Sequence, residues 1–202
     1  PGASIVGLPG CPDEKEAVHV ALYLARALEN SGLPVYPERA IEDAIQRPLF
    51  LSGHRRRLRI VFHPGSGATK KNCPPEFWFD LMTALRKSIP PAREMPVVLL
   101  GPAEEKLLPL FSGHEGVEAL FSPDMDRLSL LLQDALLYMG HDSGITHLAA
   151  MLGAPTIALF RHSSVVQWRP LGPSVKVIEA TASGPELVEQ VLRAANEFLL
   201  AL

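Results

Sequence analysis

The chain has 202 residues, of which 47% are hydrophobic and 20% charged, and its 19 basic and 22 acidic side chains give a formal net charge of −3. This composition is typical of one large globular domain or two small ones. The near-neutral balance argues against a nucleic-acid-binding protein, since such domains are usually clearly basic. Two cysteines, Cys11 and Cys73, lack the spacing of a disulfide framework or a metal motif and favour a reducing compartment.

The longest apolar stretch, residues 145–160, is interrupted by Thr, His, Gly and Pro and is shorter than the roughly 20 residues that a membrane-spanning helix needs. We therefore expect no transmembrane segment. The chain begins at Pro1 with neither an initiator methionine nor a signal region, and we expect it to be part of a longer protein.

The first predicted element is an amphipathic helix from Asp13 to Leu33, because apolar residues recur there at intervals of three and four. The next segment, from Pro34 to Arg59, contains three prolines, a basic cluster and a possible short helix over residues 38–46. It has the character of a linker that leads into a domain.

From Leu58 onward, short apolar runs alternate with helical patterns, each separated by Gly or Pro. We expect strands at residues 59–63, 97–100, 117–120, 136–139, 156–160 and 175–178. We expect helices at residues 75–87, 104–111, 126–132, 145–152 and 185–202. This alternation predicts an α/β fold with a doubly wound, Rossmann-like parallel sheet. Ligands of such sheets bind outside the carboxyl ends of the strands, so the strand-to-helix loops are the candidate sites.

The first candidate loop, residues 63–71, reads HPGSGATKK and follows a predicted strand. Small residues such as Gly67 let the backbone approach an anion, while Ser66, Lys70 and Lys71 supply hydrogen-bond donors and positive charge. The spacing matches neither the P-loop nor the dinucleotide fingerprint. The loop predicts phosphate binding, with an ordinary turn carrying surface lysines as the alternative.

The second candidate loop, residues 140–147, reads GHDSGITH and leads from a buried strand into a helix. Asp142 and Ser143 occupy the position of a helix N-cap, which is one explanation for them. The alternative is anion binding, because the free N–H groups at Ser143, Gly144 and Ile145 and the helix dipole together suit a diphosphate.

The same loop allows two catalytic alternatives, and its spacing supports neither. A nucleophile elbow requires Gly two residues before the serine, where this chain has His141. A zinc site built from His141, Asp142 and His147 lacks the usual ligand spacings. For His147 alone, a hydrogen-bonded structural role is the common case.

The third candidate loop, residues 101–105, follows the expected strand at residues 97–100 and carries Glu104 and Glu105. A carboxylate at such a position either accepts hydrogen bonds from ribose hydroxyls or favours the first turn of a helix. The sequence leaves both roles open. Residues 161–164 and 168–173 follow the fifth strand and are placed to close over a ligand.

Four segments, HPGSGATKKNCPPEFW, VVLLGPAEE, MGHDSGITHLAAMLGAPTIALF and WRPLGP, occur in this order between residues 58 and 173. In order and spacing they resemble glycosyltransferase family 9, the ADP-heptose:lipopolysaccharide heptosyltransferases. The resemblance implies a GT-B architecture, in which two Rossmann-like domains face each other across a cleft. Residues 58–202 would then be the carboxyl-terminal, donor-binding domain, and residues 1–57 the linker helix with a remnant of the amino-terminal domain.

The resemblance also implies roles for single residues. Lys71 matches a lysine that contacts the donor near its phosphates or ribose, and Glu105 an acid assigned to the ribose. Asp142, Ser143 and Gly144 match the loop that holds the diphosphate and sugar, and His147 the histidine of the following helix. The full expected donor-binding set consists of Ser66, Gly67, Lys70, Lys71, Glu105, Asp142, Ser143, Gly144 and His147.

The chain departs from the family pattern at four positions. Cys73 stands where the family usually has Trp, His141 where Asn is commoner, Thr146 where Met is frequent, and Arg161 where Gly usually opens the loop. The family's catalytic base, an Asp of the amino-terminal domain, has no counterpart in this chain, so no catalytic residue is assigned.

By this resemblance, the complete protein transfers a sugar with inversion from a nucleoside diphosphate sugar, ADP-heptose, to a lipopolysaccharide-type, lipid-linked saccharide acceptor. Hydrogen-bond donors that are preorganised around the departing diphosphate lower the barrier to transfer, so no metal or cofactor is expected. The acceptor would bind through the missing domain, and this chain alone would be inactive. We expect a cytoplasmic enzyme, peripherally associated with the inner face of the inner membrane. A non-catalytic nucleotide-sugar binding module and a nucleotide-sugar epimerase-like enzyme are the alternatives.

Overall fold

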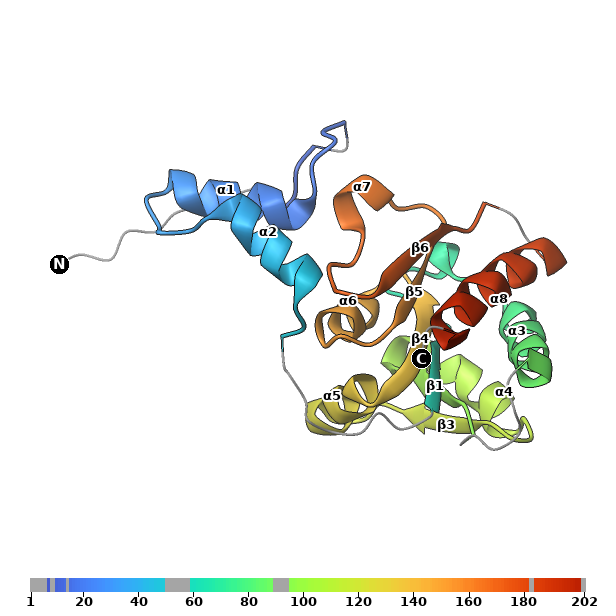
Figure 1. The fold of residues 1–202 in the computed structure, drawn as a ribbon. Coiled ribbons are helices and arrows are strands. Elements are labelled where there is room, and N and C mark those ends of the chain that lie inside the picture. The colour runs from blue at the N-terminus through green and yellow to red at the C-terminus, as the bar shows by residue number, and fades with distance from the viewer. Residues whose placement is uncertain are drawn as a thin grey trace.

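The computed structural model describes residues 7, 10–13, 15–49, 59–88, 95–181 and 184–200. Its centre is a six-stranded, fully parallel sheet with the strand order β3-β2-β1-β4-β5-β6, and helices cover both of its faces (Figure 1). The strands are β1 (Arg59–His63), β2 (Val97–Leu100), β3 (Glu118–Phe121), β4 (Ala135–His141), β5 (Thr156–Phe160) and β6 (Val175–Glu179). The predicted α/β, doubly wound fold class is confirmed.

The helices are α1 (Val20–Asn30), α2 (Pro37–Gln46), α3 (Pro75–Ser88), α4 (Leu108–Ser112), α5 (Met125–Gln133), α6 (Gly144–Met151), α7 (Val165–Trp168) and α8 (Pro185–Leu200). Two 3-10 turns, η1 (Thr69–Lys71) and η2 (Pro102–Leu107), complete the set. The short helix α7 was not predicted, and β4 is longer than expected at both ends. Residues 201–202 of the expected last helix lie outside the described residues.

The helix expected at residues 104–111 is wrong in type over its first half. The structure has the 3-10 turn η2 there and an α-helix only from Leu108. Pro109 explains the division, since proline has no N–H to donate and is tolerated only in the first turn of a helix.

Alternating side chains of the central strands fill two cores, as two-sided burial of a parallel sheet requires. On one face Phe62 of β1 packs in a cluster with α3 and α8, which includes Trp78 and Val191. On the other face Val61 packs in a cluster with α5 and α6, which includes Leu132 and Ala149. Figure 1 shows the two pairs of helices on opposite sides of the sheet.

The strand order reverses between β1 and β4, and the register fixes what meets there. His63 at the end of β1 pairs with Gly140 of β4, and His141 at the end of β4 pairs with Leu159 of β5. The loops that follow β1, β4 and β5 therefore begin side by side at the carboxyl edge of the sheet. Two of them are the candidate loops at residues 63–71 and 140–147.

The first helix begins at Val20 and not at Asp13 as expected. The carbonyl groups that would start the longer helix have another partner. Gln167 of α7 donates from Nε2 to the backbone oxygen of Asp13 at 2.7 Å and to that of Glu16 at 3.0 Å. Because this contact spans about 150 residues of sequence, helical periodicity could not reveal it.

His19 sets the new start of α1. Its Nδ1 accepts a hydrogen bond from the backbone N–H of Ala21 at 3.1 Å, so the ring hydrogen lies on Nε2, which donates to the carbonyl oxygen of Arg169 at 2.9 Å. One imidazole thus caps the helix and ties it to the residue after α7.

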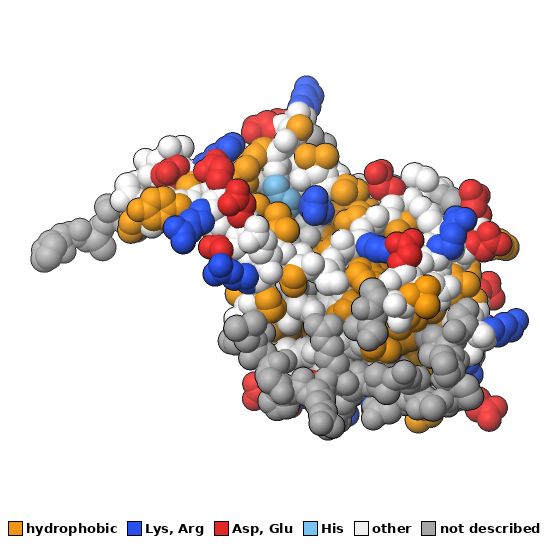
Figure 2. Space-filling model, viewed as in Figure 1, with side chains coloured by type: hydrophobic (Ala, Val, Ile, Leu, Met, Phe, Trp, Pro, Cys, Tyr) orange, Lys and Arg blue, Asp and Glu red, His pale blue; other side chains and the backbone are white. Residues whose placement is uncertain are grey.

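Helices α1 and α2 pack against each other and form an arm that projects from the sheet domain (Figure 1). The arm rejoins the domain where Leu49 N–H donates to the Met151 carbonyl oxygen at 2.8 Å. Apolar side chains, among them Leu28, Leu33 and Tyr36, stay exposed on it, and orange side chains mark its surface in Figure 2. The expected domain boundary at residue 57 falls in residues 50–58, outside the described residues. None of the described helices is both long and apolar enough to cross a membrane.

The loop between α7 and β6 depends on a close backbone approach at Gly172. A Cβ added there would lie 2.3 Å from the Ala150 carbonyl oxygen of α6. We expect Gly172→Ala to lower the free energy of unfolding by about 1–3 kcal/mol through overpacking. In urea unfolding, Gly10→Ala is the matched control, because an added Cβ at Gly10 meets no atom within 4 Å. Equal midpoints for the two variants would contradict the packing.

Candidate functional site

Three of the predicted residues come together at the carboxyl edge of the sheet. Lys71 on η1 places its Nζ 2.7 Å from Oδ2 of Asp142, which follows β4. His147 on the first turns of α6 places Nε2 3.6 Å from Oδ1 of the same carboxylate. Segments 71 residues apart in sequence thus meet at one buried acid.

Asp142 is held in its ionised form. Burial by itself raises the pKa of this carboxyl, but the nearby His147 ring and the hydrogen bond from Lys71 outweigh burial and hold the pKa well below its usual range. The Lys71 ammonium group is consequently fixed in the site before any ligand arrives.

The amino end of α6 is open. Ser143 is its N-cap and accepts a hydrogen bond from the Thr146 N–H at 3.4 Å. Within the described residues, the N–H groups of Gly144 and Ile145 have no acceptor, as expected in the first turn of a helix. A Cβ added at Gly144 would meet no atom within 4 Å, so the space in front of these groups is free of described atoms.

A buried polar network fixes the orientation of Ser143. Thr146 Oγ1 donates its one hydrogen to the His141 carbonyl oxygen, so it must accept from Tyr138 Oη and from Ser143 Oγ, each at 3.1 Å. Ser143 Oγ then accepts from His63 Nδ1 at 3.4 Å. Sequence spacing could not predict roles for His63, Tyr138 or Thr146, because this chain of contacts joins side chains from β1, β4 and α6.

The groups Ser143, His63 and Glu104 follow one another as in a catalytic triad, but their geometry does not support nucleophilic catalysis. The Ser143 hydrogen is committed to Thr146 and is not available for transfer to His63. His63 Nε2 and Glu104 Oε2 are 3.9 Å apart, beyond hydrogen-bond distance. The geometry thus agrees with the missing nucleophile-elbow motif.

The loop after β1 is held by its own side chains. Ser66 is buried, and its Oγ lies 2.6 Å from Asn72 Oδ1 and 2.9 Å from the Ala68 carbonyl oxygen. Gly67 and Lys70 are exposed at the loop surface. The structure thus places Ser66 inside the loop, whereas Gly67 and Lys70 face outward.

Of the two neighbouring acids after β2, the structure brings Glu104 to the site and leaves Glu105 exposed. Glu104 Oε2 accepts a hydrogen bond from the Gly101 N–H at 2.9 Å. Gly65 makes room for this side chain, since a Cβ there would lie 2.0 Å from the Glu104 Cδ. The capping-box spacing from Gly101 to Glu104 is the sequence signal that could have separated the two acids.

His141 points into the protein rather than toward a ligand. Its Nε2 accepts a hydrogen bond from the Cys73 N–H at 2.8 Å, and its ring packs edge-on against Trp78. Among the described residues, no three His, Cys, Asp or Glu side chains are grouped as metal ligands.

The model of the family "Glycosyltransferase family 9 (heptosyltransferase)" matches residues 12–194 of the chain. The chain belongs to glycosyltransferase family 9. A search of curated proteins found no match.

Solved structures share the fold of this family 9 chain. ADP-heptose lps heptosyltransferase II of E. coli has a TM-score of 0.62 and 23% sequence identity over 75% of this chain and 48% of its own. A family 9 glycosyl transferase from Veillonella parvula DSM 2008 has a TM-score of 0.68 and 18% sequence identity; the match covers 93% of this chain and 62% of that protein. E. coli heptosyltransferase WaaC with ADP has a TM-score of 0.57 and 21% sequence identity; the match covers 69% of this chain and 45% of that protein. The family 9 chain thus spans about half to three-fifths of the length of these proteins.

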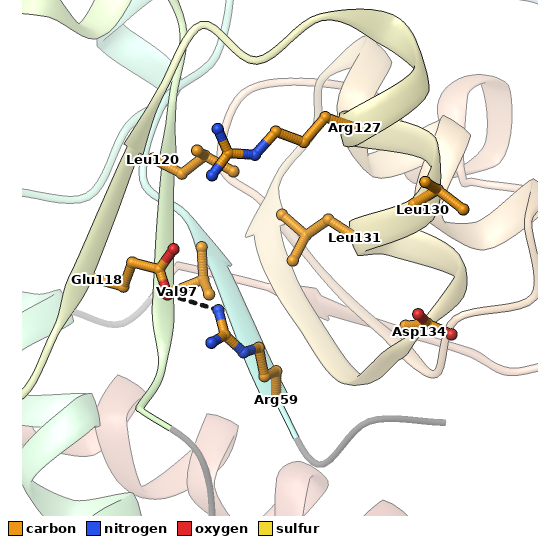
Figure 3. A pocket seen from close by; sticks show the side chains of 8 residues that line it. All are labelled: Arg59, Val97, Glu118, Leu120, Arg127, Leu130, Leu131 and Asp134. Carbon is orange, nitrogen blue, oxygen red and sulfur yellow. Dashed lines mark hydrogen bonds and ion pairs between the residues drawn. The ribbon is translucent and has the colours of Figure 1, made fainter. Parts of the chain in front are cut away.

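A hollow of about 650 Å³ lies at the opposite edge of the sheet, near the amino ends of β1, β2 and β3. Arg59 and Glu118 are joined across it by an ion pair of 2.6 Å. Figure 3 shows Arg127 and Leu131 reaching from α5 toward the strands. Ligands of parallel α/β sheets bind at the carboxyl edge, so we assign the candidate site of the family 9 chain to the other end.

Two buried histidines of the site predict how stability depends on pH. Burial lowers the pKa of His63 to about 4 and that of His141 to about 3. Between about pH 6.5 and pH 4 the unfolded chain takes up protons at these residues and the folded chain does not. We expect the free energy of unfolding to fall with decreasing pH, by up to about 1.4 kcal/mol per unit for each histidine.

Urea unfolding at pH 7, 6 and 5 checks this dependence. His63→Gln should have about half the pH slope of the wild type, whereas His162→Gln, at an exposed histidine, should keep the full slope. Asp142 does not contribute in this range, because a carboxyl with a lowered pKa loses its stabilising effect only below about pH 4. Equal slopes for the wild type and His63→Gln would contradict the burial of a neutral His63.

Proposed function

We propose that this chain is the carboxyl-terminal, donor-binding part of a glycosyltransferase that uses a nucleoside diphosphate sugar. Membership of family 9 supports glycosyl transfer in general. The observation that carries the proposal is the Lys71–Asp142 pair beside the open amino end of α6, at the point where the strand order reverses. Nucleotides bind at this point in doubly wound sheets.

The diphosphate would bind in front of α6. The N–H groups of Gly144 and Ile145 point out of the helix end, and the helix dipole places partial positive charge there. Lys71 Nζ adds a full positive charge. Because charge accumulates on the diphosphate as the sugar leaves, these fixed donors stabilise the transition state more than the ground state.

Asp142 would serve two purposes. Its carboxylate holds Lys71 and faces His147, and a carboxylate at this edge can also accept hydrogen bonds from sugar hydroxyls. Glu104, buried beside Gly65, would shape the loop on the β1 side. We propose that Glu105 binds the ribose, since its exposed side chain can turn toward a ligand.

ADP-heptose is the donor that we propose, with a lipopolysaccharide-type acceptor. Two proteins that share the fold are named as ADP-heptose lps heptosyltransferase II and as heptosyltransferase WaaC with ADP. Transfer with inversion needs a general base for the acceptor hydroxyl, and we place that base, like the acceptor, in a domain outside this chain. The chain alone should bind the donor without transferring the sugar.

We further propose that the whole enzyme works in the cytoplasm, peripherally bound to the inner membrane.

Calorimetric titration of the 202-residue chain with ADP tests the site. Lys71→Met removes a charge-assisted hydrogen bond and should weaken ADP binding about tenfold or more. Gly144→Leu should also weaken binding, by filling the space in front of the α6 N–H groups, with little effect on stability because this space is free of described atoms.

Lys87→Met, at an exposed lysine of α3, is the charge-matched control and should bind ADP like the wild type. If the Lys71 and Gly144 variants bind as tightly as this control, the proposed donor site is wrong.

A further inference from the structure

Arg161 follows β5 but contacts the loop after β1, a position at the carboxyl edge that its place in the sequence does not predict. It is the first residue after β5, and β5 lies beside β4, away from β1. Its Nη1 nevertheless donates to the Asn72 carbonyl oxygen, at 3.0 Å, in the loop after β1. The side chain therefore reaches across the end of β4, where His141 precedes the loop that leads into α6.

The electrostatic effect of Arg161 on its neighbours agrees with this position. Burial raises the pKa of the Cys73 thiol, and the Arg161 guanidinium opposes that rise. Burial likewise lowers the pKa of His141, and Arg161 adds to that decrease. The guanidinium thus lies within reach of both the β1 loop and the end of β4.

The positive charges at this edge differ in how far they are already neutralised. Lys71 is paired with the Asp142 carboxylate, and Lys70 is exposed to solvent, where its charge is screened. In the part of the chain that the structure describes, no carboxylate pairs with Arg161. Among the described residues of this edge, Arg161 is therefore a half-buried cation without a counter-ion.

A guanidinium has five N–H donors in a planar fork; the Asn72 carbonyl oxygen accepts from one of them, and a second is directed at the Cys73 sulfur. The remaining donors suit the oxygens of a phosphoryl group, which arginine binds in a bidentate manner. A half-buried arginine with spare donors and no counter-ion is therefore a preformed anion site.

We propose that Arg161 binds the diphosphate of the donor and makes this site selective for diphosphates over monophosphates. One phosphoryl group lies at the amino end of α6, and the second meets the Arg161 guanidinium. This inference rests on the proposed donor function. Lys71 lies in the loop after β1 and Arg161 in the loop after β5, on opposite sides of β4. The diphosphate would therefore be held from both of these loops.

The same contact gives Arg161 a part in the reaction. As the acceptor hydroxyl oxygen bonds to the sugar carbon and gives its proton to the base outside this chain, the bond between the sugar and the diphosphate breaks, and its electron pair becomes negative charge on the diphosphate oxygen. A fixed guanidinium beside that oxygen stabilises the charge without reorganisation. Arg161 also links the β5 loop to Asn72, so the loops after β1 and β5 are already joined before a ligand binds.

The test is a calorimetric titration of the 202-residue chain with ADP, AMP and inorganic pyrophosphate. Arg161→Gln should weaken ADP and pyrophosphate binding about 10- to 100-fold and AMP binding less than about threefold. Arg161→Lys keeps the charge but not the fork, and should recover part of the loss. Arg193→Gln, at an exposed arginine of α8, should bind all three ligands like the wild type. Urea unfolding of each variant shows whether the fold is retained.

The outcomes separate this inference from the proposed function. If Arg161→Gln is folded and binds ADP as tightly as the wild type, Arg161 is not a donor ligand, although the nucleotide site stands. If the wild type binds pyrophosphate through Arg161 but binds neither nucleotide, the anion site stands and the nucleotide function fails. Equal losses for AMP and ADP overturn the selectivity, and a wild type that binds none of the three ligands overturns both proposals.

Discussion

The reversal of strand order between β1 and β4 is the constraint on which the candidate site depends. The connections that leave these two strands pass to opposite faces of the sheet, so none of the described helices covers the edge between them. Register then decides which residues stand at that edge, since His63 pairs with Gly140 and His141 with Leu159. The polar loops could not meet in this way if β1, β4 or β5 were shifted by one residue along its neighbour.

Polar groups buried under the site give it a defined shape. Tyr138, Thr146, Ser143 and His63 form one chain of hydrogen bonds in which each hydroxyl hydrogen has a single destination. Such a network specifies one arrangement when all of its members are satisfied. The cost is acid sensitivity, because the buried His63 stays neutral only while the chain is folded.

The sequence predicted the sheet well because each strand is a short apolar run bounded by turn residues. It also singled out Lys71, Asp142 and His147, whose side chains meet in the structure at the carboxyl edge of the sheet. The resemblance pointed to Glu105, whereas the acid that the structure buries beside the β1 loop is Glu104, whose side chain accepts the hydrogen bond that starts η2. The sequence also could not place the start of α1, which depends on a hydrogen bond from Gln167.

Binding of a diphosphate at the amino end of α6 can be followed through the amide chemical shifts of the chain during a titration with ADP. We expect the amide signals of Ser143, Gly144 and Ile145 to shift most, together with those of the β1 loop. Signals of Glu118 and Leu120, which line the hollow at the opposite edge, should stay in place. Shifts concentrated at that hollow, or no shifts at α6 when the site is saturated, would show that the diphosphate does not bind there.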